Sequence, residues 1–312
     1  MLVFIARRMV WTGVILALVA TATFAMTVLL PSDPARLIAG PHADAQTVAE
    51  IRQELGLDDP LIVQYGRYMS KLAQGDLGKS YRTQYPVSED IADRFPRTLM
   101  LAIGAVLVEI LIGIPIGIFA ALRAGRPADY LSMTGALVGI SAPTFFIGLL
   151  LMYLFGFRLG MFPIGGYGEG GLNTLWHLIL PSVTLGVAGA AYHSRLIRSE
   201  MLDLLDQDFV RTARAKGLPE WRVIGVHVLR SALVPVVTLL GLDLGTLLGG
   251  AVITEAVFAW PGLGKLAIDG IYQRDLPVIM GTVIVSSAMI LLANLLVDIS
   301  YAWLDPRSRE SL

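Results

Sequence analysis

The apolar residues of this chain are gathered into six long runs separated by polar segments. The runs cover residues 9–30, 98–122, 130–157, 172–194, 231–254 and 276–297. A helix needs about 20 apolar residues to cross a bilayer core about 30 Å thick, and every run is at least that long. The pattern therefore predicts an all-α polytopic membrane protein with six transmembrane helices.

Prolines interrupt four of these runs, at Pro115, Pro143, Pro181 and Pro235. Membrane helices tolerate proline where neighbouring helices, polar side chains or waters satisfy the freed backbone groups. We therefore expect all four prolines to lie within membrane spans.

The first run follows Arg7 and Arg8, a combination that also begins secretory signal peptides. Its 22 residues exceed the apolar core of a signal peptide, about 7–15 residues, and five more runs follow. We therefore expect residues 1–30 to contain a short N-terminal tail and an uncleaved first transmembrane helix.

The overall composition agrees with a membrane protein. Of 312 residues, 55% are hydrophobic and 16% are charged, whereas soluble domains carry about 25% charged residues. A net charge of −1 gives no electrostatic reason to expect a nucleic-acid partner. The chain has no cysteine, which excludes disulfides, thiolate metal sites and cysteine nucleophiles, and its four histidines lack metal-ligand spacing.

Lysine and arginine are unevenly distributed between the segments that join the runs. With the N-terminus inside, the inner segments hold thirteen of these residues and the two short outer loops hold three. The long segment 31–97 is left out because loops of over about 60 residues cross the membrane largely regardless of charge. The positive-inside rule therefore predicts that both termini are cytoplasmic.

The segment 31–97 is too long for a simple connector and predicts a small extracytoplasmic subdomain between the first and second transmembrane helices. An amphipathic helix is expected over 44–55, ended by Gly56, and another over 61–72. Residues 73–80 nearly match the P-loop pattern of nucleotide-binding proteins. Because a P-loop follows a buried strand and this segment follows an amphipathic helix, we expect a turn instead.

The inner loop 195–230 carries a short segment whose charges are ordered as in a helix. One acidic residue comes first and three basic residues come last, namely Asp208, Arg211, Arg214 and Lys216. Gly217 is the predicted residue just after the helix, and Pro219 can open the next one. These residues alone leave two interpretations, a helix that docks on a cytoplasmic partner or a basic loop on anionic headgroups. Apolar residues at near-helical spacing are expected to share one face: Leu202, Leu205, Phe209 and Ala213.

The same loop resembles the cytoplasmic loop of the permease subunits of bacterial ATP-binding-cassette (ABC) importers. The general pattern of that family is Glu-Ala-Ala, three residues, Gly, nine residues and Ile-x-Leu-Pro, and this chain matches it at Ala213, Gly217 and Leu229. The dipeptide/oligopeptide/nickel branch has its own variant, which residues 211–235 resemble over their full length. Similar segments occur elsewhere, at residues 31–35, 55–60, 75–78, 249–264 and 305–307.

This resemblance implies the transmembrane fold of a type I ABC importer, with a permease core over residues 98–303 and a cytoplasmic tail over 304–312. It implies a second, non-identical permease subunit, two cytoplasmic ABC ATPases, an extracytoplasmic substrate-binding protein and a place in the bacterial inner membrane. ATP and magnesium would bind to the ATPases, so no cofactor and no enzymatic activity are expected in this chain. The cargo would be di- or oligopeptides, with nickel, glutathione or another small solute as alternatives.

The resemblance also implies that the inner-loop segment is a coupling helix, which sits in a groove of one ATPase. Its residues in this chain are Asp208, Arg211, Thr212, Ala213, Arg214, Lys216 and Gly217. Ala213 is expected to be small because it contacts the groove. Gly217 is expected either because a Cβ would clash there or because its φ is positive.

Two ionisable residues lie at membrane depth, Glu109 in the second run and Asp243 in the fifth. Such groups are costly in lipid and face a cavity or a partner, so both are candidates to line the pathway. Asp243 can meet the amino terminus of a peptide or a metal cation, or it can pair with a Ser or His of another span. His193 lies near the inner end of its run and is expected to extend its ring towards the interface.

Small residues recur at every fourth position of the fifth run, at Gly241, Gly245 and Gly249. This spacing lets another helix approach closely. The approaching helix belongs either to the same subunit or to the subunit interface beside the pathway, and the second case would make Gly245 and Gly249 pathway residues.

Two other functions fit the sequence less well. Ser141 and His193 suggest an intramembrane serine protease, but Pro143 stands where a nucleophile motif has glycine. A self-sufficient secondary carrier would show internal repeats or more spans in one chain.

Overall fold

The computed structural model describes residues 2–29, 33–40 and 42–304 of the chain. Its regular elements are helices, and an antiparallel bridge joins Lys79 to Pro86. The helices are, in chain order, α1 (Leu2–Leu29), α2 (Pro34–Ala39), α3 (Ala45–Leu55), α4 (Leu61–Ala73), α5 (Val87–Val108), α6 (Ile114–Leu122), α7 (Pro127–Ser141), α8 (Thr144–Leu151), α9 (Gly171–Leu205), α10 (Asp208–Ala215), α11 (Glu220–Arg222), α12 (Leu229–Leu248), α13 (Val252–Val257), α14 (Leu263–Gln273) and α15 (Leu276–Leu304). π-Helical segments continue α5, α8 and α11, over Glu109–Gly113, Met152–Arg158 and Val223–Val228.

Among the described residues, five helices are long and apolar enough to cross a membrane, and a sixth span is broken. The five are Ala6–Thr27, Val87–Leu122, Gly171–Leu205, Glu220–Leu248 and Leu276–Ile299. These lengths confirm the predicted all-α polytopic fold. The predicted tail 304–312 lies, except for its first residue, outside the described residues, as do the first two residues of the motif 31–35.

The third span is bent rather than continuous. Its two pieces, Pro127–Ser141 and Thr144–Arg158, meet at an angle of 104°. Ala142 is extended (φ −77°, ψ 130°), which is the conformation that a following proline favours. The sequence pattern therefore predicted the existence of this span correctly, but not that Pro143 would break it.

The helix α9 lies at the centre of the fold, where it contacts α5, α6, α7, α8 and α12. At 1.5 Å per residue, its 35 residues extend about 52 Å, well beyond a hydrocarbon core of about 30 Å. The helix therefore continues past residue 194, the expected end of the fourth span, and carries the first part of the inner loop.

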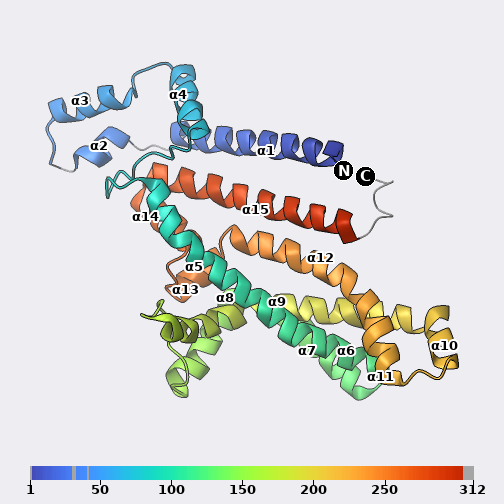
Figure 1. Ribbon diagram of the computed structural model, residues 1–312. Coiled ribbons are helices and arrows are strands. Elements are labelled where there is room, and N and C mark those ends of the chain that lie inside the picture. Colours follow the sequence, from blue (N-terminus) through green and yellow to red (C-terminus); the bar gives the residue numbers. More distant parts are fainter. Residues whose placement is uncertain (1, 30–32, 41, 305–312) are drawn as a thin grey trace.

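The segment between α1 and α5 forms an ordered helical subdomain at one end of the spans (Figure 1). Both predicted amphipathic helices are confirmed, as α3 and α4, whereas the short helix α2 was not predicted. The side chain of Asp44 caps α3 by accepting a hydrogen bond from the Thr47 backbone N–H (2.8 Å). Gly56 ends α3 in the left-handed conformation, with φ 65°. Local capping chemistry thus sets the ends of α3.

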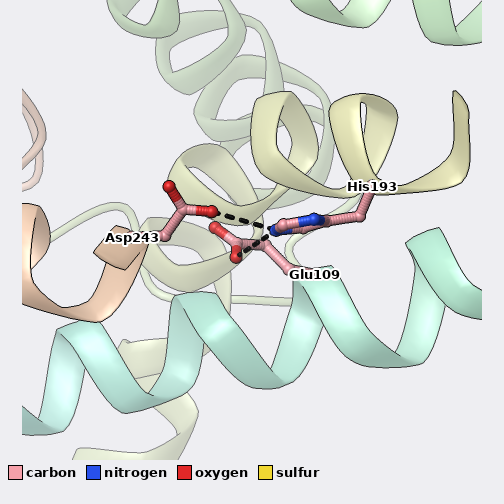
Figure 2. Close-up of side chains that lie close together, drawn as sticks. All are labelled: Glu109, His193 and Asp243. Atoms are coloured by element: carbon pink, nitrogen blue, oxygen red, sulfur yellow. Dashed lines mark hydrogen bonds and ion pairs between the residues drawn. The ribbon is translucent and has the colours of Figure 1, made fainter. Parts of the chain in front are cut away.

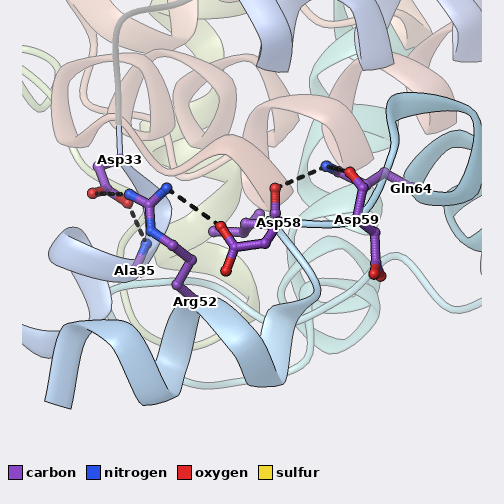
Figure 3. A network of polar contacts seen from close by, with 7 residues as sticks. Asp33, Ala35, Arg52, Asp58, Asp59 and Gln64 are labelled. Atoms are coloured by element: carbon purple, nitrogen blue, oxygen red, sulfur yellow. Dashed lines mark hydrogen bonds and ion pairs between the residues drawn. The ribbon is translucent and has the colours of Figure 1, made fainter. Parts of the chain in front are cut away.

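Polar side chains connect the pieces of this subdomain (Figure 3). Arg52 of α3 donates a hydrogen bond to Asp33 before α2 (2.6 Å) and lies 3.9 Å from Asp58. Gln64 of α4 donates to the backbone oxygen of Asp59 (2.8 Å). These bonds hold α2, α3 and α4 as one unit.

The subdomain is attached to the membrane spans at two places. Tyr65 of α4 packs edge-on against Phe24 of α1, with 5.3 Å between the ring centroids. The hydroxyl of Ser80 donates a hydrogen bond to Asp275, between α14 and α15 (2.5 Å). Ser80 ends the P-loop-like segment 73–80, which begins at the last residue of α4 and turns at Gln74 and Gly75, as predicted.

A buried carboxylate that no motif predicted holds α13 to α5 and α14. Glu255 of α13 is fully buried and accepts hydrogen bonds from the Thr98 hydroxyl (2.9 Å) and the Lys265 backbone N–H (2.9 Å). A Cβ at Gly262 would lie 2.4 Å from this carboxylate. The segment 249–264, one of those that carry the family resemblance, therefore folds around Glu255.

Candidate functional sites: the inner-loop helix and an intramembrane polar cluster

The inner-loop helix α10 ends in a complete Schellman motif. Gly217 has φ 73°, its N–H donates to the Arg214 carbonyl (2.9 Å), and the Leu218 N–H donates to the Ala213 carbonyl (3.3 Å). These two bonds satisfy carbonyls at the end of the helix, and glycine adopts positive φ without a steric penalty. Gly217 is therefore the residue just after the helix, as predicted. Within this chain its positive φ explains the glycine, because nothing lies within 4 Å of a Cβ built there.

One face of α10 packs against the rest of the chain. Val210 is fully buried, Ala213 is 7% exposed, and both belong to a core cluster that includes Ile197 and Met201 of α9 and Val228 before α12. Ala213 therefore packs mainly inside this chain, and its expected contact with a partner's groove stays a prediction.

The single apolar face expected from Leu202 to Ala213 is also wrong. The helix α9 ends at Leu205 and α10 begins at Asp208, so the expected residues belong to two different helices. Because the break resets the helical phase, Phe209 is 41% exposed and Val210 points inward instead.

The other face of α10 is exposed and largely basic. Its exposed residues are Asp208, Phe209, Arg211, Thr212, Arg214, Ala215 and Lys216. Arg214 donates two hydrogen bonds to Glu220 (2.6 and 3.2 Å), which raises the pKa of Arg214. Arg211 lies 3.5 Å from Asp208, and both side chains are so exposed that the pair contributes only about 0–1 kcal/mol. The surface thus offers a partner several charges and one aromatic ring.

The helix α10 lies at the opposite end of the spans from the subdomain α2–α4 (Figure 1). The start of α1 and the end of α15 lie at the same end as α10. These three parts of the chain therefore share one side of the membrane.

Glu109 and Asp243 come together with His193 in a polar cluster built from three spans (Figure 2). His193 Nε2 lies 2.9 Å from Asp243 Oδ2 and 3.5 Å from Glu109 Oε2. Pairing of Asp243 with a histidine of another span, one of the alternatives above, is thus what the structure shows. The expectation that His193 reaches towards the interface is wrong, because its side chain is fully buried.

Two backbone features bring Glu109 to His193. Glu109 begins a π-helical segment, and Pro115, two residues after that segment, has no N–H to donate to the Leu111 carbonyl. Single π-helical turns inside α-helices frequently occur at functional sites. On α9, a Cβ at Gly189 would lie 2.3 Å from the Glu109 carboxylate, so glycine leaves room for that group one turn before His193.

The glycines of α12 face α15 of the same chain. Cβ atoms built at Gly241, Gly245 and Gly249 would lie 2.5–2.9 Å from side chains of α15. Of the two interpretations of this spacing, packing within the subunit accounts for these contacts. Gly245 and Gly249 thus serve the close approach of α12 to α15.

The two residues that suggested a serine protease, Ser141 and His193, form other hydrogen bonds. The hydroxyl of Ser141 donates to the Leu137 carbonyl of its own helix (2.8 Å). His193 is bonded to Asp243 instead. The two therefore do not form a nucleophile and base pair in this structure.

Family comparison matches almost the whole chain. Residues 113–310 match the family described as binding-protein-dependent transport system inner membrane component. Residues 1–102 match the N-terminal region of the same kind of membrane component.

Two relatives are similar over nearly their full length. The glutathione transport system permease protein GsiC of Salmonella paratyphi A is 47% identical over 309 residues, which are 99% of each chain. The probable D,D-dipeptide transport system permease protein DdpB of Escherichia coli K12 is 45% identical and aligns with 97% of this chain and 96% of its own.

Solved ABC importers share the fold. The methionine ABC transporter MetNI in an inward-facing conformation aligns with 69% of this chain and 96% of its own, with TM-score 0.58 and 18% identity. An amino acid ABC transporter aligns with 69% of this chain and 94% of its own, with TM-score 0.52 and 18% identity. At this identity the likeness concerns the fold alone, which is that of a type I ABC importer transmembrane domain. The chain therefore belongs to the binding-protein-dependent transport system inner membrane components, as a multi-pass ABC importer permease of the peptide-permease branch.

Proposed function

We propose that this chain forms half of the translocation pathway of an ATP-driven importer of di- or oligopeptides, with both termini in the cytoplasm. The relatives named for glutathione and for D,D-dipeptides support a small peptide as cargo, because each aligns over at least 96% of its length. A second, non-identical permease subunit completes the pathway, and an extracytoplasmic binding protein delivers the cargo. Two cytoplasmic ATPases bind ATP and magnesium and supply the energy.

The observation that carries this proposal is the construction of α10. This helix is short, has a defined end at Gly217 and lies between the fourth and fifth spans. Its buried face packs on α9 and on the π-helical segment that leads into α12. A displacement of α10 therefore moves the adjoining ends of both spans.

The exposed face of α10 is the surface that an ATPase groove would hold. Closure of the two ATPases around ATP moves these grooves and, with them, the coupling helices. Exposed ion pairs contribute only about 0–1 kcal/mol each, so residues such as Arg211 and Lys216 would set the register of docking more than its affinity. The resulting tilt of α9 and α12 switches the side from which the pathway is open.

The pathway passes the surface around Asp243, near the middle of α12. The side chain of Asp243 is 39% exposed although it belongs to a membrane-spanning segment. A carboxylate in contact with lipid would be costly, whereas a water-filled pathway or a partner subunit removes that cost. Glu109 is buried beside His193, so it lies behind Asp243 and not on the pathway surface.

The test is affinity purification of the tagged chain in mild detergent, with and without Gly217→Asp. Aspartate at this position adds a negative charge to the carboxyl end of α10, where the helix dipole disfavours it, in the middle of a basic surface. We expect two ATPases and a second permease to co-purify with the wild type. The ATPases should be lost from the variant, while the second permease is retained.

Gly40→Asp is the matched control. Gly40 also has positive φ (86°) with no atom within 4 Å of a built Cβ, but it lies in the subdomain at the other end of the spans. This variant should retain the ATPases. A wild-type chain that purifies alone, or loss of the ATPases from both variants alike, would contradict the proposed role of α10.

A further inference from the structure

When all three groups are ionised, the cluster of Glu109, His193 and Asp243 carries more negative than positive charge. One imidazole can hold at most one positive charge, against two carboxylates. The fully ionised cluster therefore has a net charge of −1. A cationic group that approaches it completes the charge balance, and the position of the cluster inside the membrane spans strengthens the attraction because the surroundings are of low polarity.

The cluster also has unused polar atoms. Glu109 Oε2 and His193 Nδ1 are buried and have no hydrogen-bond partner in the described part of the chain. Their side chains are only 4% and 0% exposed, whereas that of Asp243 is 39% exposed. Asp243 is therefore the member that a ligand can reach. His193 holds it through Oδ2, which leaves its Oδ1 for a ligand (Figure 2).

We propose that Asp243 binds the free α-ammonium group of the cargo, with His193 and Glu109 as positioning residues. An ammonium group has three N–H donors and one positive charge, which match the free oxygen of Asp243 and the net charge of the cluster. His193 fixes the orientation of Asp243. Glu109, when ionised, supplies the negative charge that His193 would otherwise cancel. The cargo class is thus peptides with an unblocked amino terminus. The inference rests on the proposed function.

A bound metal ion is the competing occupant, because the ligand atoms of the three residues lie within 4.8 Å of one another. A metal-bound histidine almost always donates its second ring N–H to an acceptor, which fixes the ring. His193 Nδ1 has no such acceptor among the described residues, and its Nε2 is already bonded to Asp243. The geometry therefore favours an ammonium group over a resident metal.

The experiment uses the complete importer in proteoliposomes, with its ATPases, second permease and binding protein. ATP-driven uptake is measured for alanyl-alanine and for N-acetyl-alanyl-alanine in wild type, Asp243→Asn and Glu109→Gln. We expect Asp243→Asn to lower the preference for the free amine about tenfold or more, the loss typical of a hydrogen bond to a charged group. Glu109→Gln should lower the preference for the free amine less, because Glu109 acts only through its charge. Stimulation of the ATPases by the loaded binding protein should persist in both variants.

Asp298→Asn is the matched control. Asp298 is also a carboxylate within a membrane span, but it forms an ion pair with Arg8 on α1 and lies outside the cluster. Asp298→Asn should leave the preference for the free amine unchanged. Because the binding protein also selects cargo, saturation-transfer NMR of both probes on the permease–ATPase complex without binding protein gives a second reading. The same preference for the free amine should appear there and disappear in Asp243→Asn.

The possible results separate the inference from the proposed function. If all variants keep the wild-type preference while uptake is intact, the ammonium site is overturned and the importer stands. If the purified wild type carries a stoichiometric metal that Asp243→Asn loses, the cluster is a metal site and the inference is wrong. If the wild-type complex neither assembles nor takes up either probe, the proposed function itself fails.

Discussion

Gly217 shows how a single residue fixes the end of the inner-loop helix α10. Its φ of 73° is in the left-handed region, and both bonds of the Schellman motif depend on that conformation. An L-residue in this region costs about 1–2 kcal/mol, although asparagine is more tolerant than alanine. Since the space around Gly217 is open, substitutions there test backbone conformation without a steric clash.

We predict that ATPase retention falls in the order Gly217, Gly217→Asn, Gly217→Ala. The reason is that alanine favours a continued helix over the left-handed turn, which alters the exit of the chain from α10. The ratio of ATPase to permease after affinity purification measures the effect. Gly160→Ala, at another glycine with positive φ (61°) and open space, is the control and should leave the ratio unchanged. Equal retention in all variants would show that this turn does not matter for docking.

Gly189 is the residue that lets Glu109 lie beside His193. A Cβ there would be 2.3 Å from Glu109 Oε1, so Gly189→Ala must displace a buried carboxylate. We predict that this variant lowers the thermal unfolding temperature of the purified permease. Gly135→Ala, in α7 with nothing within 4 Å, should keep or slightly raise it, since alanine favours a helix by about 1 kcal/mol over glycine.

A second substitution makes the Gly189 prediction specific. Glu109→Asp shortens the side chain by one methylene and withdraws the carboxylate from the new methyl group. Combined with Gly189→Ala, it should recover part of the lost stability. If Gly189→Ala is harmless, or if the second change gives no recovery, the close contact between Gly189 and Glu109 is not important for folding.

At the scale of elements, the sequence correctly predicted those helix ends that are determined by neighbouring residues. The helix α3 begins at an Asp44 cap and ends at Gly56, and both signals can be read within thirteen residues. The inner-loop end at Gly217 is of the same kind. Six apolar runs likewise correspond to six spans, because the length of an apolar helix does not depend on its neighbours.

The features that were missed depend on contacts between distant segments. Prolines lie inside α9 and α12 without dividing them, yet Pro143 breaks the third span, so proline alone does not decide the outcome. His193 is buried in a cluster with Glu109 and Asp243, which belong to other spans. The bond between Ser80 and Asp275 joins residues 195 positions apart. No pattern within one segment carries this information.

At the scale of elements, we make a prediction about the buried and the exposed face of α10. Val210 is fully buried and its neighbour Phe209 is 41% exposed, so truncating each one tests a different face. Val210→Ala removes core contacts worth about 1–3 kcal/mol and should loosen α10 from α9. Phe209→Ala should leave the fold unchanged but weaken ATPase retention.

Limited trypsin digestion of the purified permease distinguishes these effects, because cleavage after Arg211, Arg214 and Lys216 requires α10 to open locally. Val210→Ala should speed cleavage there, whereas Phe209→Ala should digest at the wild-type rate. The reverse pattern would mean that the assignment of the buried and exposed faces is wrong.

For the whole molecule, the arrangement of the chain across the membrane is decisive. The helix α10, the start of α1 and the end of α15 lie at one end of the spans, and α2–α4 lie at the other (Figure 1). The excess of lysine and arginine in the inner segments predicts that the first end lies in the cytoplasm. Coupling to cytoplasmic ATPases requires this orientation, since in the opposite one α10 could not meet them.

Orientation can be tested directly because the chain contains no cysteine. Lys71 at the end of α4 and Lys216 at the end of α10 are both exposed, so a single cysteine at either position can be labelled without disturbing the fold. In spheroplasts, a membrane-impermeant maleimide should label Lys71→Cys at once and Lys216→Cys only after permeabilisation. The permeabilised sample is also the control for the reactivity of each thiol. Labelling of Lys216→Cys in intact spheroplasts would place α10 outside the cell, and the coupling role proposed for it would then be impossible whatever its geometry.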